Sequence, residues 1–355
     1  MILHRLLARQ ALPWVRAGSR AVARVVQWNN PHGRAPRLVA DGPVRPGPSD
    51  APAVARTAGA LVGTRAGGYV IDARNEVAAS RLRFPWGADL HPVLTSPRLP
   101  RAQTVAGPLL NLVTPEARGN YYHWLLDQTP RLGFFRPGEL RAFRTVVVGG
   151  AGLPYERETL GAAGFDPAAR VIVAGGDELF AADEVWTPPL LDGEGWLPWK
   201  RDYLRSLWPA AGAGEPGRRL FVGRGNARKR RLAGEPELAR ALGAVGFETL
   251  DAGALSVAGQ AAAFAGARVV VGVHGAALAN CVFLPPGALL VEILNAQRPQ
   301  VFYRDIAAAG GVRYHALFAD PAGADSGDPY HANGDDLRLS PRAHDELLAL
   351  VAAEQ

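Results

Sequence analysis

Short runs of apolar residues alternate with amphipathic stretches through the first half of the chain. Runs of aliphatic or aromatic residues predict strands, and apolar residues that recur every three or four positions predict helices. The predicted strands cover 69–71, 109–113, 145–148, 171–173 and 184–186, and the predicted helices cover 120–135 and 155–163. Residues 37–60 are rich in Pro, Gly and Ala and have little periodicity, which predicts a loop.

A second alternating series begins after residue 217. It predicts strands at 219–222, 247–250, 268–273 and 289–293, helices at 235–245 and 256–266, and a helix that opens at 275. Strands that alternate with helices of about ten residues indicate parallel sheets with helical crossovers. The predicted fold class is therefore α/β, with two Rossmann-like, doubly wound domains.

Changes in composition place the boundaries between these domains. Residues 191–217 are rich in Pro, Gly and Trp and predict an interdomain connector with a short helix at 199–207. We expect a basic N-terminal segment and loop over 1–60, one domain over 61–190 and a second over 218–320. Residues 321–355 are predicted to form a C-terminal tail with a final helix.

The overall composition excludes several classes of protein. The chain has 355 residues, 48% of them hydrophobic, which excludes wholesale disorder. It contains no uncharged apolar stretch of about 18 residues, so no transmembrane helix is expected. Its one cysteine, Cys281, excludes an intramolecular disulfide framework and a cysteine-built metal site.

The formal charge of +6 is carried almost entirely by arginine. Lys200 and Lys229 are the only lysines among 39 basic residues, so 37 are arginines. This usage, with abundant Ala, Gly and Pro, is typical of a GC-rich genome. Because the arginines are spread along the chain, with one dense run at 228–231, we expect no nucleic-acid partner.

Arginines also recur at near-helical spacing through residues 1–36. They interrupt the apolar core that a secretory signal needs, so export by this segment is not expected. Two hypotheses remain: residues 1–28 form a basic amphipathic helix in peripheral contact with an anionic membrane, or a helix packed on the protein. The expected location is the cytoplasm, with the inner face of the membrane as the site of any such contact.

The apolar strand at 268–273 runs directly into small residues that open a helix. His274, Gly275 and Ala276 stand at this turn, and Asn280 follows in the helix. Ligands of doubly wound sheets bind beyond the carboxyl ends of the strands, where a helix N-terminus suits a phosphate. The pattern predicts phosphate binding there; the alternative is a tight turn without a ligand.

A cationic loop follows the strand at 219–222 in the same domain. Arg224 and Arg228 are the residues we expect to hold phosphate oxygens, because guanidinium groups bind them bidentately. The alternative is a solvated run of charges. Glu292, in the strand at 289–293, is a candidate partner for ribose hydroxyls, or else forms an ordinary salt bridge.

Polar residues also share one face of the predicted helix at 120–135. Asn120, His123 and Asp127 are spaced i, i+3 and i+7, with Trp124 beside them. An imidazole or a carboxylate there could take a proton from a sugar hydroxyl, and either His123 or Asp127 could be the base. The alternative is that Asn120 caps the helix, His123 is satisfied in the core and Asp127 is solvated.

Several of these segments, taken in order, resemble the glycosyltransferase 61 family. The resemblance covers about 119–305 and is carried by the segments 120–127, 220–224, 246–247, 274–280, 283–287 and 291–292. It implies a GT-B architecture, with the active site in a cleft between two Rossmann-like domains. The N-terminal domain would be the acceptor side, with Asn120 and Trp124, and the C-terminal domain would bind a nucleotide-sugar donor.

The resemblance further implies inverting transfer of a hexosyl or pentosyl group, commonly without an essential metal. The nucleotide sugar would be a substrate, and no cofactor is expected. Relatives that act on bacterial capsular polysaccharide fit the composition best, so a glycan or polysaccharide acceptor is expected. Two alternatives stay open: a non-catalytic carbohydrate- or nucleotide-binding protein of this fold, and a polysaccharide pyruvyl transferase.

Overall fold

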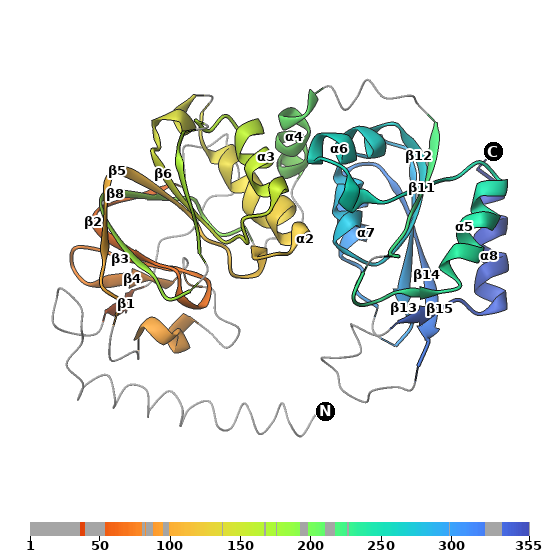
Figure 1. The fold of residues 1–355 in the computed structure, drawn as a ribbon, viewed down its shortest axis with the longest axis horizontal. Helices are drawn as coiled ribbons and strands as arrows, with labels where there is room; N and C mark the ends of the chain where they lie inside the picture. Colours follow the sequence, from red (N-terminus) through yellow and green to blue (C-terminus); the bar gives the residue numbers. More distant parts are fainter. Residues whose placement is uncertain are drawn as a thin grey trace. The chain divides into compact units, whose positions relative to one another are not determined.

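The structure is a computed structural model, and the chain in it divides into two compact units, Met1–Asp192 and Gly193–Gln355 (Figure 1). It describes residues 36–39, 54–79, 82, 88–94, 99–136, 138–166, 168–174, 176–191, 198–209, 217–225, 227–297, 299–323 and 336–354. Residues 1–28, for which a membrane or packing helix is expected, lie outside the described residues.

The N-terminal unit is built on a six-stranded sheet. Its order is β3 (Tyr69–Ile71), β2 (Ala55–Gly63), β8 (Leu179–Thr187), β5 (Gln103–Leu112), β6 (Thr145–Val148) and β7 (Arg170–Val173). The strands β8, β5, β6 and β7 are parallel, whereas β2 runs antiparallel to both of its neighbours. A separate parallel pair joins β1 (Arg37–Val39) to β4 (Glu76–Ala78).

The prediction of a loop over 37–60 is wrong for the described part of that range. Strand β2 begins at Ala55, and β1 also falls inside it. The residues in the first half of β2 are half-buried or exposed, so they carry no apolar run that would predict a strand. Their strand is held by its pairing with β8. The Arg56 guanidinium, for example, lies 3.6 Å above the centre of the Trp186 ring.

The predicted helix at 120–135 is a succession of three helical forms. An α-helical turn, α2 (Tyr121–His123), passes into a π-helical turn, η6 (Trp124–Gln128), and then a 3₁₀ helix, η7 (Thr129–Phe134). Pro130 explains the change, because it lacks an N–H and its ring clashes with the carbonyl four residues before it. Among the described residues of this unit the longest helix is α3 (Pro154–Ala162). Short 3₁₀ turns are η1 (Arg65–Gly67), η3 (Ala88–Leu90), η4 (Pro92–Leu94), η5 (Pro115–Ala117) and η8 (Glu139–Ala142).

The C-terminal unit contains a seven-stranded sheet. Its order is β10 (Leu232–Ala233), β15 (Leu337–Arg338), β14 (Arg313–Pro321), β13 (Leu289–Asn295), β12 (Ala267–Val273), β9 (Arg218–Val222) and β11 (Glu248–Leu250). Every neighbouring pair is parallel except β14 and β15. The five parallel strands β11, β9, β12, β13 and β14 thus follow the doubly wound order 2-1-3-4-5, which reverses direction between β9 and β12.

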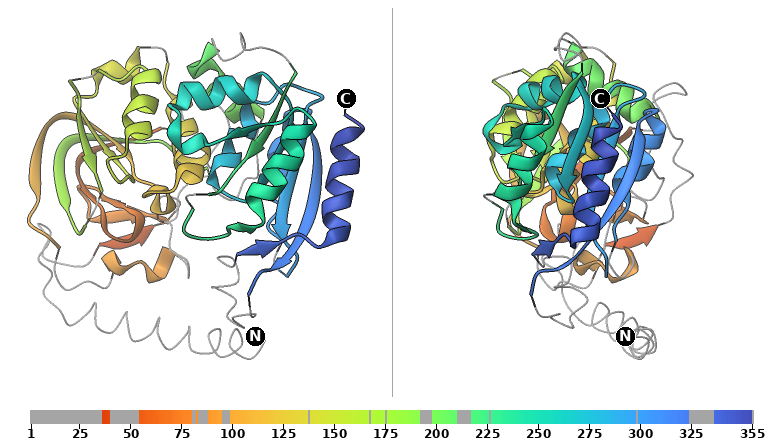
Figure 2. Two further views of the ribbon diagram at one scale, coloured as in Figure 1. Left: turned by 45° about the vertical axis from the view of Figure 1, so that its right-hand side comes forward. Right: turned by 90° about the vertical axis from the view of Figure 1, so that its right-hand side faces the viewer.

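Helices cover both faces of this sheet. On one face α5 (Glu235–Ala244) and α8 (Pro341–Ala352) pack against the strands, and α6 (Val257–Ala265) and α7 (Phe302–Ala309) lie on the other (Figures 1 and 2). The 3₁₀ helices η10 (Ala252–Ala254) and η11 (Ala276–Phe283) complete the unit. The prediction of two α/β domains with mostly parallel sheets is confirmed.

Two segments expected outside the domains belong to the C-terminal unit. In the expected connector, α4 (Pro198–Leu207) is anchored by Arg201 and Arg205, which donate to the backbone carbonyls of residues 282–284. In the expected tail, Leu347 and Val351 of α8 are fully buried in the core of the unit. Within the described residues, no helix is both long enough and apolar enough to cross a membrane.

Candidate functional site

The loops that follow β9 and β12 meet at the point where the strand order of the C-terminal sheet reverses. The loop after β9 holds Arg224 and Arg230, and His274 and Gly275 follow β12 directly. In open α/β sheets, ligands bind in the crevice at such a switch point. The structure therefore brings three candidate residues, Arg224, His274 and Gly275, together with Arg230 where this fold ordinarily binds a ligand.

Arg224 lies directly over Gly275. Its Nη1 donates to the His274 carbonyl at 3.3 Å and its Nη2 to the Lys229 carbonyl at 2.8 Å. A Cβ atom on residue 275 would stand 1.8 Å from Arg224 Nη1. The absence of a side chain at Gly275 therefore makes room for this guanidinium.

Two guanidinium groups share this place without a counter-ion. Burial, and then the charge of Arg230, lower the pKa of Arg224 from 12.5 to about 10. Burial likewise lowers the pKa of Arg230. The Nε atoms of both are buried without a hydrogen-bond partner, and neither side chain forms an ion pair with any residue that the structure describes. The shift of Arg224 corresponds to about 3 kcal/mol against the charged form, with burial as its largest cause, and an anionic ligand would offset part of it.

The remaining cations of the run differ from Arg230. Arg228 and Lys229 are exposed, and Arg231 is exposed and paired with Asp336 at 2.6 Å. Arg230 turns inward because its backbone adopts a left-handed conformation, with φ of 56°. The structure thus favours Arg230 over Arg228 as the second residue that holds an anion.

His274 is held by a buried carboxylate. Its Nδ1 lies 2.5 Å from Glu292 Oε1, and the Tyr314 hydroxyl donates to Glu292 Oε2 at 2.6 Å. Glu292 was a candidate partner for ribose hydroxyls, with an ordinary salt bridge as the alternative. It lies in the middle of β13, fully buried, with both oxygens engaged, so it is not available to a ribose hydroxyl.

The first turn of α7 lies beside His274. The Tyr303 ring is buried 5.6 Å from the imidazole, centre to centre, and its hydroxyl donates to the Gly275 carbonyl at 2.7 Å. Phe302 stands 6.3 Å from the imidazole and is 52% exposed. The site therefore has a fixed aromatic floor and an accessible aromatic ring at its edge.

Asn280 and Ala276 contribute to the fold around the site. Asn280 is fully buried and donates to Gln260 Oε1 at 2.7 Å and to the Ala277 carbonyl at 2.9 Å, so it does not face a ligand. Ala276 begins η11, which is a 3₁₀ helix that starts one residue after the predicted opening.

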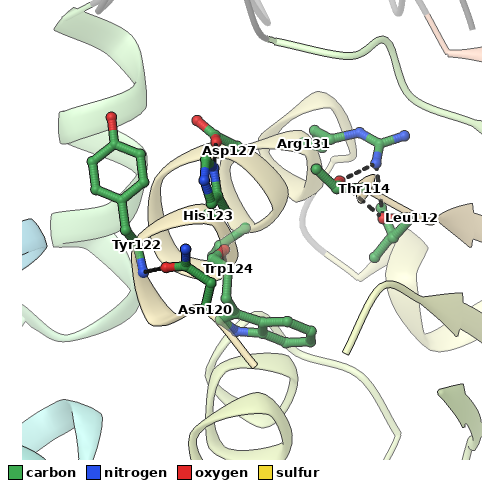
Figure 3. Close-up of polar contacts among 9 residues, drawn as sticks. Leu112, Thr114, Asn120, Tyr122, His123, Trp124, Asp127 and Arg131 are labelled. Atoms are coloured by element: carbon green, nitrogen blue, oxygen red, sulfur yellow. Dashed lines mark hydrogen bonds and ion pairs between the residues drawn. The ribbon is translucent and has the colours of Figure 1, made fainter. Parts of the chain in front are cut away.

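The other candidate residues lie on the π-helical turn of the N-terminal unit. His123 Nδ1 is 2.6 Å from Asp127 Oδ2, and both side chains are partly exposed, at 27% and 22% (Figure 3). A single π-helical turn inside a helix is rare and is frequent at functional sites. The pair suits proton transfer, because a carboxylate on Nδ1 orients the ring and leaves Nε2 for a substrate.

The two predicted acceptor-side residues support this helix. The Asn120 side chain caps it by accepting from the Tyr122 N–H at 3.1 Å. Trp124 is 1% exposed, and in Figure 3 its indole points away from His123 and Asp127. Its burial means that Trp124 packs the helix against the unit, in an edge-to-face contact with Tyr155.

The switch point of the N-terminal sheet is filled by the protein itself. The buried Arg131 guanidinium donates to Leu112 O and Thr114 Oγ1 after β5 and to Pro188 O after β8 (Figure 3). The loop after β6 is closed by the buried Glu156 carboxylate, which accepts from the N–H groups of residues 151 and 152 at 2.8 Å each. Both places where this sheet could take an anionic ligand are therefore occupied, unlike the switch point of the C-terminal sheet.

Comparison with models of protein families gives one match. The family model described as glycosyltransferase 61 matches residues 121–291. The chain carries a glycosyltransferase 61 domain. No curated protein matches the chain. The matched segment of this glycosyltransferase 61 domain includes His123, Asp127, Arg224, Arg230 and His274.

Sequence reasoning missed three residues of the C-terminal site. Arg230 stood in the run of cations, but nothing in the run showed which cation turns inward. Tyr303 and Tyr314 lie beyond the glycosyltransferase 61 match, in α7 and β14, two elements that no pattern predicted. Among the residues that the structure describes, no cluster of three or more His, Cys, Asp or Glu side chains could hold a metal ion.

Proposed function

We propose that the chain transfers a sugar from a nucleoside-diphosphate sugar to a hydroxyl group of a glycan, with inversion at the anomeric carbon. The observation that carries this proposal is the pair of buried, unneutralised guanidinium groups beside His274 at the switch point. The diphosphate of the donor supplies the negative charge that this site lacks. The glycosyltransferase 61 domain supplies the class of reaction.

In this proposal the N-terminal unit supplies the base. His123 Nε2 takes the proton of the acceptor hydroxyl, and Asp127 orients the ring through Nδ1. The acceptor oxygen then forms a bond to the anomeric carbon while the bond from that carbon to the diphosphate breaks. A single displacement of this kind inverts the configuration.

The leaving diphosphate gains negative charge as the glycosidic bond to it breaks. Arg224, Arg230 and His274 are fixed before the reaction and oppose that charge in a partly desolvated site, where such stabilisation is strongest. The exposed Arg228 attracts the donor at longer range. The resemblance to bacterial relatives extends the proposal to a cell-surface polysaccharide as acceptor and to the cytoplasm as the place of reaction.

A panel of nucleotides tests this function. UDP, GDP, CMP and their sugar conjugates are added to the full chain, and the melting temperature is measured, since a ligand of the native state raises it. We expect one nucleoside diphosphate and its sugar conjugates to stabilise the protein. Stabilisation by none of them contradicts a donor site. Stabilisation without transfer to any glycan in a library would favour a non-catalytic binding protein.

A further inference from the structure

Three side chains, from β13, β14 and the residue after β12, form a partly buried chain of hydrogen bonds that ends at the candidate site. Glu292 lies opposite Gly272 in the β12–β13 ladder, so its side chain meets His274 just beyond the end of β12. On the next strand, Tyr314 lies opposite Leu290 and its hydroxyl reaches the other oxygen of Glu292. This order places one fully buried carboxylate between a phenol and an imidazole.

The positions of the protons follow from the partners. Burial and the hydrogen bond to Glu292 raise the pKa of Tyr314 above its ordinary value, so the phenol keeps its proton and donates it. Glu292 then accepts on both oxygens, and His274 directs an Nδ1–H toward it. Nε2 is therefore the nitrogen of His274 that is left to meet a ligand, and the His274 side chain is 12% exposed.

The charges around the imidazole are unbalanced in the absence of a ligand. Glu292 faces it from β13 and favours a positive ring, and the neutral phenols of Tyr314 and Tyr303 add no charge. Arg224 and Arg230 approach from the loop after β9 and oppose a third positive charge. A diphosphate would favour a positive imidazole, because its two negative charges neutralise the two arginines.

We propose that binding of a nucleoside-diphosphate sugar in the C-terminal unit is coupled to uptake of one proton at His274 Nε2, with Glu292 and Tyr314 as the positioning residues. The protonated Nε2–H donates to a phosphate oxygen, and the charged ring stays in place for the departure of the diphosphate. This inference rests on the proposed function, since it needs a diphosphate ligand.

Proton uptake is counted by isothermal titration calorimetry of the full chain at pH 7.5 in Tris and in HEPES. UDP-glucose and GDP-mannose are the titrants, because both phosphates of these diesters have no proton to exchange near this pH. We expect the heat of binding to differ between the two buffers in the direction of proton uptake, up to one proton per site. The His274→Gln variant should bind more weakly, with uptake near zero.

Tyr314→Phe separates positioning from packing. This variant removes one hydroxyl, and Tyr203→Phe makes the same change in α4, which is anchored to the backbone carbonyls of residues 282–284. We expect Tyr314→Phe to reduce proton uptake and therefore, by linkage, to make the loss of affinity between pH 6 and 8 shallower, whereas Tyr203→Phe should match the wild type. If Tyr314→Phe does not fold, the wild-type and His274→Gln proton counts still decide the matter.

The outcomes separate the two proposals. Binding without buffer-dependent heat, or with the same uptake in His274→Gln, overturns the proton uptake and leaves the donor site standing. No binding of either sugar nucleotide contradicts the proposed function, and this inference with it.

Discussion

Replacement of Arg230 by Gln should strengthen the fold and weaken ligand binding at the same time. In the free protein this guanidinium is partly desolvated, unpaired among the described residues and close enough to Arg224 to lower its pKa. Gln removes the charge and keeps most of the side chain. Arg and Gln are both non-glycine residues, so the cost of the left-handed backbone at this position stays the same. The change therefore isolates the charge.

The expected magnitudes follow from the site. The shift of Arg224 to a pKa of about 10 corresponds to about 3 kcal/mol, of which burial is the larger cause and Arg230 the next. Removal of Arg230 should raise the free energy of unfolding by about 0.5–2 kcal/mol. Loss of charged hydrogen bonds to a diphosphate should weaken binding by about 1.5–3 kcal/mol, or about 10- to 150-fold in Kd.

Urea unfolding gives the first quantity, and calorimetric titration with the nucleoside diphosphate that stabilises the protein gives the second. Arg228→Gln is the matched control: it removes an exposed cation two residues away and should change both quantities little. If Arg230→Gln destabilises the protein, or if Arg228→Gln loses as much affinity as Arg230→Gln, the argument from unpaired buried charge is refuted.

Three further predictions concern other parts of the molecule. Gly275→Ala should displace the Arg224 guanidinium, whose Nη1 would lie 1.8 Å from the new Cβ, and weaken diphosphate binding at least about tenfold by calorimetry. His123→Gln and Asp127→Asn should each lower sugar transfer about 10²- to 10⁴-fold with donor affinity nearly unchanged. Burial lowers the pKa of the core residue His91 to about 4, so the unfolded state takes up a proton below pH 6.5 and the folded state does not. The free energy of unfolding should therefore fall by up to about 3 kcal/mol between pH 6.5 and 4, and His91→Asn should lack this part of the fall in urea unfolding.

Each of these predictions has a clear contrary result. Unchanged diphosphate binding by Gly275→Ala would show that Arg224 holds no ligand. Near-normal transfer by both the His123 and Asp127 variants would show that proton removal is done elsewhere. Asn at position 91 keeps an acceptor near the place where His91 Nδ1 accepts from the Val93 N–H. If the free energy of unfolding depends on pH equally in the wild type and His91→Asn, the fold does not keep His91 neutral.

The apolar runs predicted most of the fold because buried parallel strands are apolar on both faces. The strands at 145–148 and 289–293 are of this kind, and both are fully buried. Strand β14 mixes buried, half-buried and exposed residues without regular alternation, so it was not predicted. The first half of β2 was not predicted either, because it carries no apolar run. The π-helical turn arises because the Pro130 ring clashes with the carbonyl four residues before it. The periodicity of apolar residues does not show this effect.

For the candidate residues, too, the sequence predicted the place of some and not of others. The spacing of His123 and Asp127 predicted a shared face, and the structure pairs them. The run 228–231 could not show that Arg230 turns inward, because that depends on its own φ and on the contacts around it. Glu292 was a candidate for contact with ribose, but it lies fully buried in the middle of β13. The sequence does not tell where a central strand ends or which neighbours bury its polar residue.

The most direct test of the central claim is calorimetric titration of UDP and GDP into the full-length wild type and the Arg224→Gln, Arg230→Gln double variant. The account predicts that at least one of the two nucleotides binds the wild type at one site and binds the double variant at least about 100-fold more weakly, since two charged contacts are lost. Equal affinity in the two proteins, or no binding of either nucleotide to the wild type, would contradict it.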